Sequence, residues 1–283
     1  MYSATYFDVA VDIGKFRKLV KERIKNKKEC IEFIKEYIYC KNSIAEEIYK
    51  YFKEQSDFSE IPDESLILVE KFKEEKEYLV FHSLYGRRVN DVLARAYAFA
   101  AGRIKSRDVE MGINDNGFFI AGEKLEEDKI ISFVKSSNLK EIMKEAIERT
   151  DILKRRFRDC AAWCLMILKN YNGREKRAGR QQIHSEFLFS AIKKISDEFP
   201  ILREARREVM EDQMDIKNSV KVLKWIEEGK VKIKKTRGLI VSPFGLNLLM
   251  QGRSDLIKME DKTAFLKRMH ELHVKVIEGK AHA

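Results

Sequence analysis

The chain has 283 residues, and its 56 Lys and Arg against 46 Asp and Glu give a formal net charge of +10 at pH 7. Hydrophobic residues make up 44% of it and prolines number only three, which excludes a disordered basic tail and favours a mainly helical fold over a β-sandwich. No apolar run approaches the roughly 18 residues of a membrane span. The N-terminal residues also lack the apolar core of a signal peptide, so we expect a cytoplasmic protein without membrane contact.

The N-terminal part of the chain predicts three helices. Between Asp8 and Gln55, apolar residues recur at the three-to-four spacing of amphipathic helices. Asn42 and Ser43 offer a cap between the second and the third helix. The next stretch contains Pro62 and breaks the helical period. We therefore predict an N-terminal helical segment at 1–60 and a second region at 61–283, with a candidate subdivision near 200.

Two β-hairpins are predicted in the middle of the chain. Short apolar runs at 65–72 and 78–83 flank a charged turn. A helix follows at about 87–105. A second pair of apolar runs is joined by Asn114, Asp115, Asn116 and Gly117, and an Asn-Gly pair in that position is a strong hairpin signal.

Helices dominate the rest of the sequence. We predict helices from about 127 to 171, at 183–198 after a glycine-bearing basic loop at 172–182, and at 201–212 and 217–228. A basic strand at 230–238, a turn at 242–245 and two last helices complete the chain. The expected fold class is α+β, mainly helical, with short β-hairpins in the middle and a small basic strand near the C-terminus.

Signatures of catalysis or of a bound metal are missing from the sequence. It has no phosphate-binding loop, no nucleophile elbow and no dinucleotide fingerprint. The five histidines are scattered, and the four cysteines, Cys30, Cys40, Cys160 and Cys164, have no CxxC spacing, which favours buried thiols over ligands or a redox pair. Binding is therefore favoured over catalysis by this chain alone, and a small hydrolase with an unrecognised site is the least favoured alternative.

Positive charge is concentrated in one segment. Ten basic residues lie between Arg149 and Arg180 against three acidic ones, a local balance of +7. An apolar stripe is predicted on the helix here, formed by Leu153, Phe157, Cys160, Ala161, Cys164, Ile167 and Leu168. The opposite side then carries Lys154, Arg155 and Arg158, which indicates an anionic partner, or else a solvated face. The second basic stretch, 230–237, is read either as a strand that follows phosphates or as a protected sheet edge.

Several blocks, in one order along nearly the whole chain, carry a family resemblance: VFHSLYGRRVNDVLARAYAFAAGR, INDNGFFI, LKRRFRDCAAWCLMILKNYNGRE, EFPILREARREVMEDQMDIKNSVKVLKWIEEGKV and SPFGLNLLMQGRSDLIKMED. With them the sequence resembles the C-terminal core region, the DEAD/H-associated domain, of archaeal Lhr-type large helicase-related proteins of superfamily 2. Members of that family are ATP-dependent DNA-translocating helicases with two RecA-like motor domains and a winged helix. The motor domains are absent here.

The resemblance implies an accessory part that clamps the translocated strand. The motor half is then a separate chain or a missing segment, ATP and Mg are expected only on it, and this chain carries no cofactor of its own. A split gene is favoured slightly over a truncated piece. An apolar docking surface for the motor half is expected on the first helix, formed by Phe7, Val11, Phe16 and Leu19.

Residues that contact single-stranded DNA or RNA are expected among the arginines, lysines and amides of the matched blocks. They are Arg87, Arg88, Arg95, Asn114, Asn116, Lys154, Arg155, Arg156, Arg158, Arg180, Gln181 and Gln182. In the structural alternative, Arg88 and Arg95 form internal ion pairs with neighbours such as Asp91, and the two asparagines only make the turn. The functional alternative is a protein–protein assembly module with a basic surface and no direct nucleic-acid contact.

Overall fold

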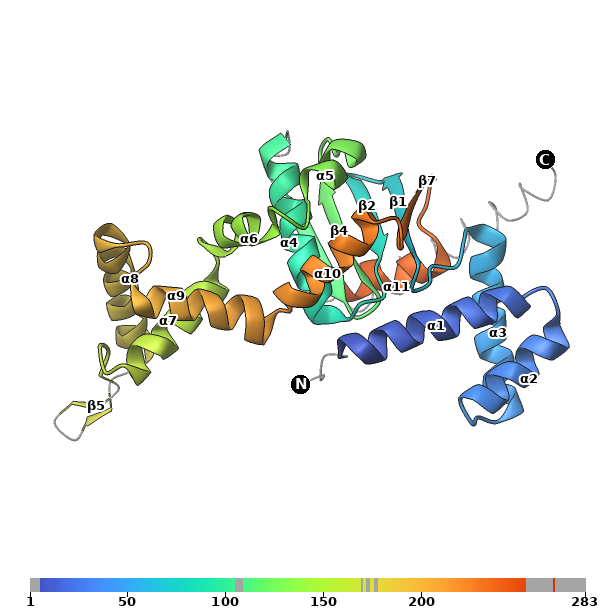
Figure 1. Ribbon diagram of the computed structural model, residues 1–283, viewed down its shortest axis with the longest axis horizontal. Helices are drawn as coiled ribbons and strands as arrows, with labels where there is room; N and C mark the ends of the chain where they lie inside the picture. The colour runs from blue at the N-terminus through green and yellow to red at the C-terminus, as the bar shows by residue number, and fades with distance from the viewer. Residues whose placement is uncertain are drawn as a thin grey trace.

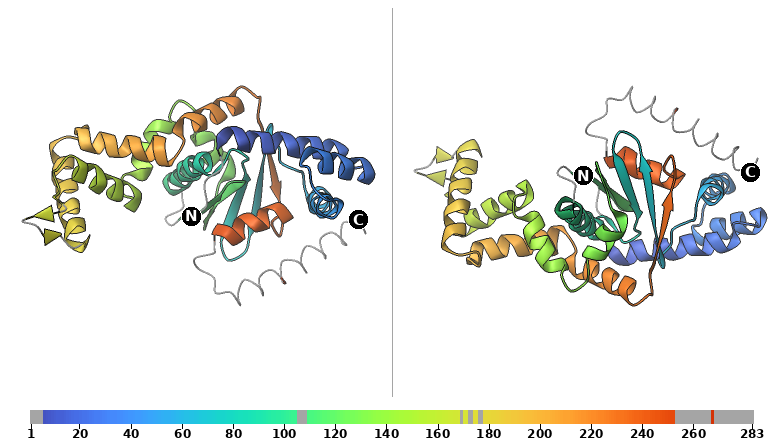
Figure 2. Two further views of the ribbon diagram at one scale, coloured as in Figure 1. Left: turned by 90° about the horizontal axis from the view of Figure 1, so that it is seen from below. Right: turned by 90° about the horizontal axis from the view of Figure 1, so that it is seen from above.

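The computed structural model describes residues 6–104, 109–168, 170–171, 174–175, 178–252 and 267. The molecule is elongated, with a β-sheet near the middle, the first three helices at one end and a group of helices from the middle of the chain at the other (Figures 1 and 2). No helix in the described ranges is long and apolar enough to cross a membrane. The predicted fold class, α+β and mainly helical, is confirmed.

The central sheet has five strands in the order β3-β4-β2-β1-β7. Strands β1 (Leu66–Lys73) and β2 (Glu77–His82) form one antiparallel hairpin, and β3 (Glu110–Asn114) and β4 (Gly117–Gly122) form the other. Both hairpins were predicted, and both are confirmed. Strand β7 (Lys232–Arg237) lies at the edge and pairs in parallel with β1.

Helices cover both faces of this sheet. Alternate strand residues such as Val69, Phe81 and Ile120 share a core with α4 (Arg87–Ile104). Their neighbours on the opposite face pack against α11 (Pro243–Gly252) instead. Because side chains alternate along a strand, burial on both faces explains why the strands are continuous apolar runs. The segment 242–245, predicted as a turn, is thus mostly the start of α11, and all of the chain after α11 except residue 267 lies outside the described residues, including the second of the two last predicted helices.

The second hairpin depends on a glycine. Gly117 has φ +156°, and a Cβ atom there would lie 2.1 Å from the carbonyl oxygen of Phe81 on the neighbouring strand. Only glycine fits this close approach of two backbones. The Asn-Gly signal in the sequence therefore has a direct steric cause.

The N-terminal segment folds as α1 (Phe7–Arg23), α2 (Lys27–Tyr37) and α3 (Asn42–Phe58), as predicted. These helices share a core of their own, built from Val20, Ile24, Cys30, Ile34, Ala45, Tyr49 and Phe52 together with Ile61 and Phe244. The predicted cap at the start of the third helix is wrong. Lys41 occupies the cap position without a side-chain hydrogen bond, and the Asn42 amide instead donates to Glu46.

The apolar face of α1 is occupied within the chain. Phe7 is buried and its ring lies about 6 Å from those of Tyr85 and Trp225. The Phe16 ring packs among aromatic rings of α2 and α3. Val11 and Leu19 are partly buried. The four residues predicted as a docking surface therefore do not form an exposed apolar surface.

A helical lobe extends from the other end of the sheet (Figure 1). It comprises α6 (Leu139–Ile147), α7 (Asp151–Trp163), a small hairpin of β5 (Asn170–Tyr171) and β6 (Arg174–Glu175), α8 (Ala178–Ile195), α9 (Pro200–Arg207) and the π-helix η1 (Glu208–Gln213). Helices α5 (Glu127–Phe133) and α10 (Ile216–Glu227) pack against α4. The helix predicted at 201–212 is thus divided into an α-helix and a π-helix.

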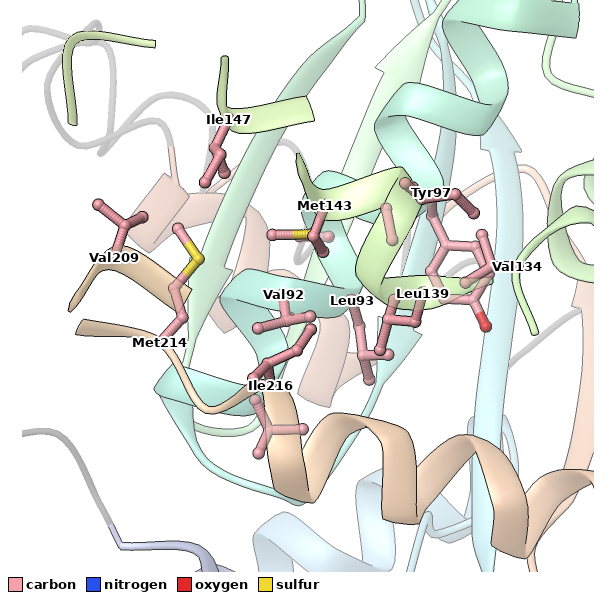
Figure 3. Close-up of a cluster of buried hydrophobic side chains, with 14 of the residues drawn as sticks. Val92, Leu93, Tyr97, Val134, Leu139, Met143, Ile147, Val209, Met214 and Ile216 are labelled. Carbon is pink, nitrogen blue, oxygen red and sulfur yellow. The ribbon is translucent and has the colours of Figure 1, made fainter. Parts of the chain in front are cut away.

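A continuous apolar core joins the lobe to the sheet (Figure 3). It includes Val92, Leu93 and Tyr97 of α4, Leu139, Met143 and Ile147 of α6, Val209 of η1, and Met214 and Ile216 near the start of α10. Segments more than 100 residues apart therefore hold the lobe in place.

The lobe departs from the predicted apolar stripe at the end of α7. Leu153, Phe157, Cys160, Ala161 and Ile167 are buried as predicted, but Cys164 and Leu168 are exposed. The helix ends at Trp163, so the 3.6-residue period no longer applies to the residues that follow. The prediction of four buried thiols is therefore wrong for Cys164, and Cys40 is only partly buried.

Candidate nucleic-acid interface

Helix α7 separates apolar and cationic residues onto two faces. Its N-terminus is capped by Thr150, whose hydroxyl accepts a hydrogen bond from the Leu153 N–H at 3.5 Å, and Asp151 lies in the first turn. Leu153 and Phe157 are fully buried. The helical period then turns Lys154, Arg155 and Arg158 away from the core, as predicted.

These three cations line a hollow between α7 and α8 of about 190 Å³. Asp151 of α7 also lines the hollow, and Gln182, Ser185 and Glu186 complete its wall from the α8 side. Within the described ranges, Lys154, Arg155 and Arg158 take part in no ion pair, whereas Lys144, Arg156, Lys193, Arg206 and Arg207 of the same lobe do. Unpaired cations around one hollow favour an anionic ligand.

Arg156 points elsewhere. Its Nη1 lies 3.4 Å from Oε2 of Glu208 on the π-helix, and its side chain is partly buried. The same glutamate accepts a hydrogen bond from the thiol of Cys160, and burial together with this carboxylate raises the pKa of Cys160 to about 12. Arg156 therefore belongs to a structural contact between α7 and η1.

Arg88 and Arg95 are both engaged within the chain. The Arg88 Nη2 donates to the carbonyl oxygens of Glu211, Asp212 and Met214 at 2.8–2.9 Å, at the end of the π-helix. The Arg95 Nε lies 2.6 Å from Oδ1 of Asp91. Arg95 follows the ion-pair alternative that the sequence left open, whereas Arg88 stabilises a helix end that lies more than 120 residues away.

The two asparagines of the second hairpin stabilise its turn. The Asn114 side chain is buried and accepts a hydrogen bond from the Asn116 N–H at 2.8 Å. Asn116 Oδ1 accepts in turn from Arg17 of α1 at 2.8 Å. Arg87 is exposed at the start of α4, where its backbone N–H donates to Asp115. Of the predicted contacts in this region, Arg87 alone has an exposed side chain.

The residues predicted to follow a flexible loop lie within α8, because this helix begins at Ala178. Gln182 reaches the hollow, and its amide donates to Glu186 at 3.4 Å. Gln181 is on the neighbouring side, beside an apolar groove. The side chain of Arg180 lies outside the described residues. The structure thus brings together Lys154, Arg155, Arg158 and Gln182, and it places Arg87, Arg88, Arg95, Asn114 and Asn116 away from them, beside the sheet.

The basic strand forms a sheet edge, and acidic residues accompany most of its cations. Lys234 is paired with Glu60, Lys235 with Asp128 and Arg237 with Glu127. Charged side chains on an edge strand discourage pairing with other chains. Of the two interpretations of this stretch, the protected edge has the structural support.

A second hollow was missed by the sequence analysis. It has a volume of about 260 Å³ and is lined by Lys140, Lys144, Glu198, Arg203, Arg206, Arg207, Met210, Glu211 and Ile216. Arg206 is buried there and bonds both Glu148 and Asp197. Hydrogen bonds from Lys144 and Arg206 lower the pKa of Asp197 to about 2. Because most cations here have acidic partners, this hollow is chiefly a network that holds α6, α8 and α9 together.

The described residues contain no group of three His, Cys, Asp or Glu side chains placed to hold a metal ion.

His82 on β2 and Glu70 on β1 form a buried titratable pair that the sequence did not predict. The Glu70 Oε1 lies 3.4 Å from His82 Nε2, and Oε2 accepts from the Ser242 N–H at 2.9 Å. Both side chains are enclosed between the sheet and α11, so this pair stabilises the start of that helix.

The structure is an α+β domain. Helices cover its mixed five-stranded sheet, and a cationic helical lobe extends from one end. The family model described as DEAD/H associated matches residues 61–245. The chain therefore belongs to the DEAD/H associated family, and the resemblance found in the ordered sequence blocks is confirmed.

Known relatives are considerably longer. The chain is 42% identical to the ATP-dependent helicase Lhr-Core of Methanothermobacter thermautotrophicus, over 94% of this chain and 31% of that protein. It is 38% identical to the ATP-dependent helicase Lhr-Core of Sulfolobus acidocaldarius, over 96% of this chain and 32% of that protein. The chain thus spans about a third of the length of these relatives.

A solved structure shares the fold. The helicase Lhr of Mycobacterium smegmatis, determined with bound ssDNA and AMP-PNP, superposes with a TM-score of 0.75 at 20% identity, over 88% of this chain and 32% of that one. At this level of identity the likeness concerns the fold, and it extends beyond the residues that the family model matches.

Proposed function

We propose that this chain is the nucleic-acid-binding accessory part of an ATP-dependent Lhr-type helicase and that it holds the translocated strand beside a motor half. The observation that carries the proposal is the set of three cations, Lys154, Arg155 and Arg158, that line one hollow of the helical lobe and form no ion pair with any described residue. Guanidinium and ammonium groups in such a position pair with successive phosphates. ATP and Mg²⁺ would then bind the motor half, which is the expected partner.

The first test is the salt dependence of binding to a labelled single-stranded 20-mer, followed by fluorescence anisotropy. For single strands the slope of log K against log salt changes by about 0.7 per phosphate contact. Replacing Lys154, Arg155 and Arg158 by alanine should therefore flatten the slope by about 2 and weaken binding at low salt at least tenfold.

A matched control removes the same charge elsewhere. Lys15, Lys50 and Lys53 lie on α1 and α3 in exposed ion pairs, and their replacement by alanine should leave the slope nearly unchanged. Equal effects of the two triple variants would mean that only net charge matters and would refute an interface on the lobe.

We also expect no ATP hydrolysis by this chain alone, so DNA-stimulated hydrolysis would contradict the accessory role.

A further inference from the structure

The outer end of the lobe exposes an unusual amount of apolar surface. Large apolar side chains are accessible around the turn after α7 and along α8, and we name them together the α7–α8 apolar surface: Trp163, Leu165, Met166, Leu168, Ile183 and Phe187. Leu165 and Phe187 are each 74% exposed. Figures 1 and 2 show α7 and α8 at the end of the molecule, away from the sheet. Contiguous apolar surface of this kind marks interaction sites, whereas single exposed residues are normal.

The α7–α8 apolar surface contains a groove. Met166, Ile167 and Leu168 form one wall, and the other wall is the stretch of α8 that carries His184, Phe187, Leu188 and Ala191. The groove has a volume of about 440 Å³, and Ile167 at its base is buried in the main core. Residues 183–191 rise about 12 Å along the axis of α8, which matches two to three turns of a helix laid beside it.

Leu165 lies where folding alone would favour glycine. Helix α7 ends in a Schellman motif, in which the Met166 N–H donates to Ala161 O at 2.9 Å and the Leu165 N–H donates to Ala162 O at 3.2 Å. This geometry requires the left-handed backbone conformation, and Leu165 has φ 57°. A leucine there is strained and exposed at once, so neither local conformation nor core packing explains it.

We propose that the α7–α8 apolar surface binds the apolar face of an amphipathic helix with acidic flanks, contributed by a protein partner. Four of the six side chains, Leu165, Met166, Leu168 and Ile183, are not aromatic, and a surface with this majority suits an apolar helix face better than stacked nucleobases. Lys194 is exposed on α8 three residues after Ala191 of the groove, and together with the net charge of +10 it complements acidic flanks. A second copy of the chain is disfavoured, because its net charge of +10 would bring like charges together. The proposal does not depend on nucleic-acid binding.

The test measures binding of a designed peptide to the full chain by fluorescence anisotropy. The probe is a labelled 14-residue peptide with Leu at positions 4, 7, 8 and 11 and mainly Glu elsewhere, and its comparison is the same composition in scrambled order. We expect the amphipathic peptide to bind at least tenfold tighter than the scrambled one. Leu165→Gly combined with Phe187→Ser should weaken that binding at least fivefold.

Leu165→Gly alone keeps the test interpretable, because glycine suits the left-handed position and the variant is expected to fold. The matched control is Tyr39→Gly. Tyr39 has φ 50°, is 94% exposed and lies after α2 at the other end of the molecule, so its replacement changes the backbone in the same way and should leave peptide binding unchanged.

Four results would overturn the proposal. The first is equal affinity for both peptides, which would show attraction by charge only, and the second is undiminished binding by the Leu165 and Phe187 variants. The third is self-association of the chain in sedimentation that Leu165→Gly abolishes. The last is loss of single-stranded DNA binding in the same variants without any binding of the amphipathic peptide. Since the Lys154, Arg155 and Arg158 variant of the DNA test leaves these apolar residues intact, failure of one proposal is distinguishable from failure of the other.

Discussion

At the scale of residues, most of the contacts that the sequence did not predict join residues that are far apart in the chain. The helical period correctly placed Lys154, Arg155 and Arg158 on one exposed face, because that face depends only on local spacing. The partners of Arg88 and Arg156 lie on the π-helix or directly after it, 52 to 126 residues away, and nothing in the local pattern indicates them. An arginine that binds phosphate and an arginine that bonds a backbone carbonyl look alike in a sequence.

The buried carboxylate Glu70 leads to a prediction about pH. Burial alone would raise the pKa of Glu70, but attraction to His82 and the hydrogen bond from the Ser242 N–H outweigh burial and hold that pKa below its ordinary value. A carboxyl whose pKa is lowered by folding contributes stability above its unfolded pKa, and this contribution is lost as the pH falls through its folded pKa. Glu70→Gln should therefore destabilise the protein at pH 6, by about 1–3 kcal/mol, and by less at pH 3.

Urea unfolding followed by circular dichroism at pH 6 and pH 3 measures this difference. The control is Glu47→Gln, which removes an exposed carboxylate paired with Lys50 and should change the unfolding free energy by less than about 0.5 kcal/mol at either pH. A cost for Glu70→Gln that stays constant across this range would show that the Glu70 charge does not stabilise the fold.

At the scale of elements, regular helices and hairpins follow the sequence pattern, while their ends and irregularities do not. Helix α8 begins at Ala178, several residues earlier than its apolar period indicates, and that extension brings Gln182 to the hollow. The π-helix at Glu208–Gln213 has no sequence signature that we recognise, although the carbonyl groups at its end are the acceptors of Arg88. The elements were therefore predictable in type, whereas the irregular junction that positions them required the tertiary structure.

The two helix ends with non-glycine residues in the left-handed region give a prediction at this scale. After α2, the Cys40 N–H donates to Lys35 O, with Tyr39 in the same position of a Schellman motif as Leu165 after α7. The left-handed conformation costs a residue with a Cβ atom about 1–2 kcal/mol, and the greater entropy of glycine in the unfolded chain offsets part of the gain. Tyr39→Gly and Leu165→Gly should each raise the unfolding free energy by roughly 0.5–1 kcal/mol.

Alanine substitutions at the same two positions separate backbone strain from loss of the side chain. Tyr39→Ala and Leu165→Ala keep a Cβ atom, so their unfolding free energies in urea should stay close to that of the unsubstituted chain. If alanine stabilised as much as glycine, removal of the exposed side chain and not relief of the backbone would be the cause.

On the scale of the whole molecule, the core of the N-terminal helices meets the rest of the fold at Phe244 of α11, while Phe7 at the start of α1 belongs to the main core. The three N-terminal helices have their own core, and α11 contributes Phe244 to it. The Phe244 ring meets that of Phe52 edge-on at 5.4 Å, and its N–H donates to Gln55 at 3.0 Å. The predicted boundary at residue 60 would therefore depend on how strongly this contact couples the N-terminal helices to the sheet.

Replacing Phe244 by alanine tests that coupling. Removal of a buried phenylalanine costs about 3 kcal/mol or more, and here the lost contacts are mainly with Phe52 and Tyr51 of α3. Hydrogen exchange measured by mass spectrometry should therefore accelerate in residues 7–58 and change little in β1, β2 and β4. Tyr51→Ala removes the half-exposed partner of the same ring pair and should cost less than about 1 kcal/mol. Equal acceleration throughout the chain would mean that the helices and the sheet unfold as one unit, and a domain boundary at residue 60 would then be wrong.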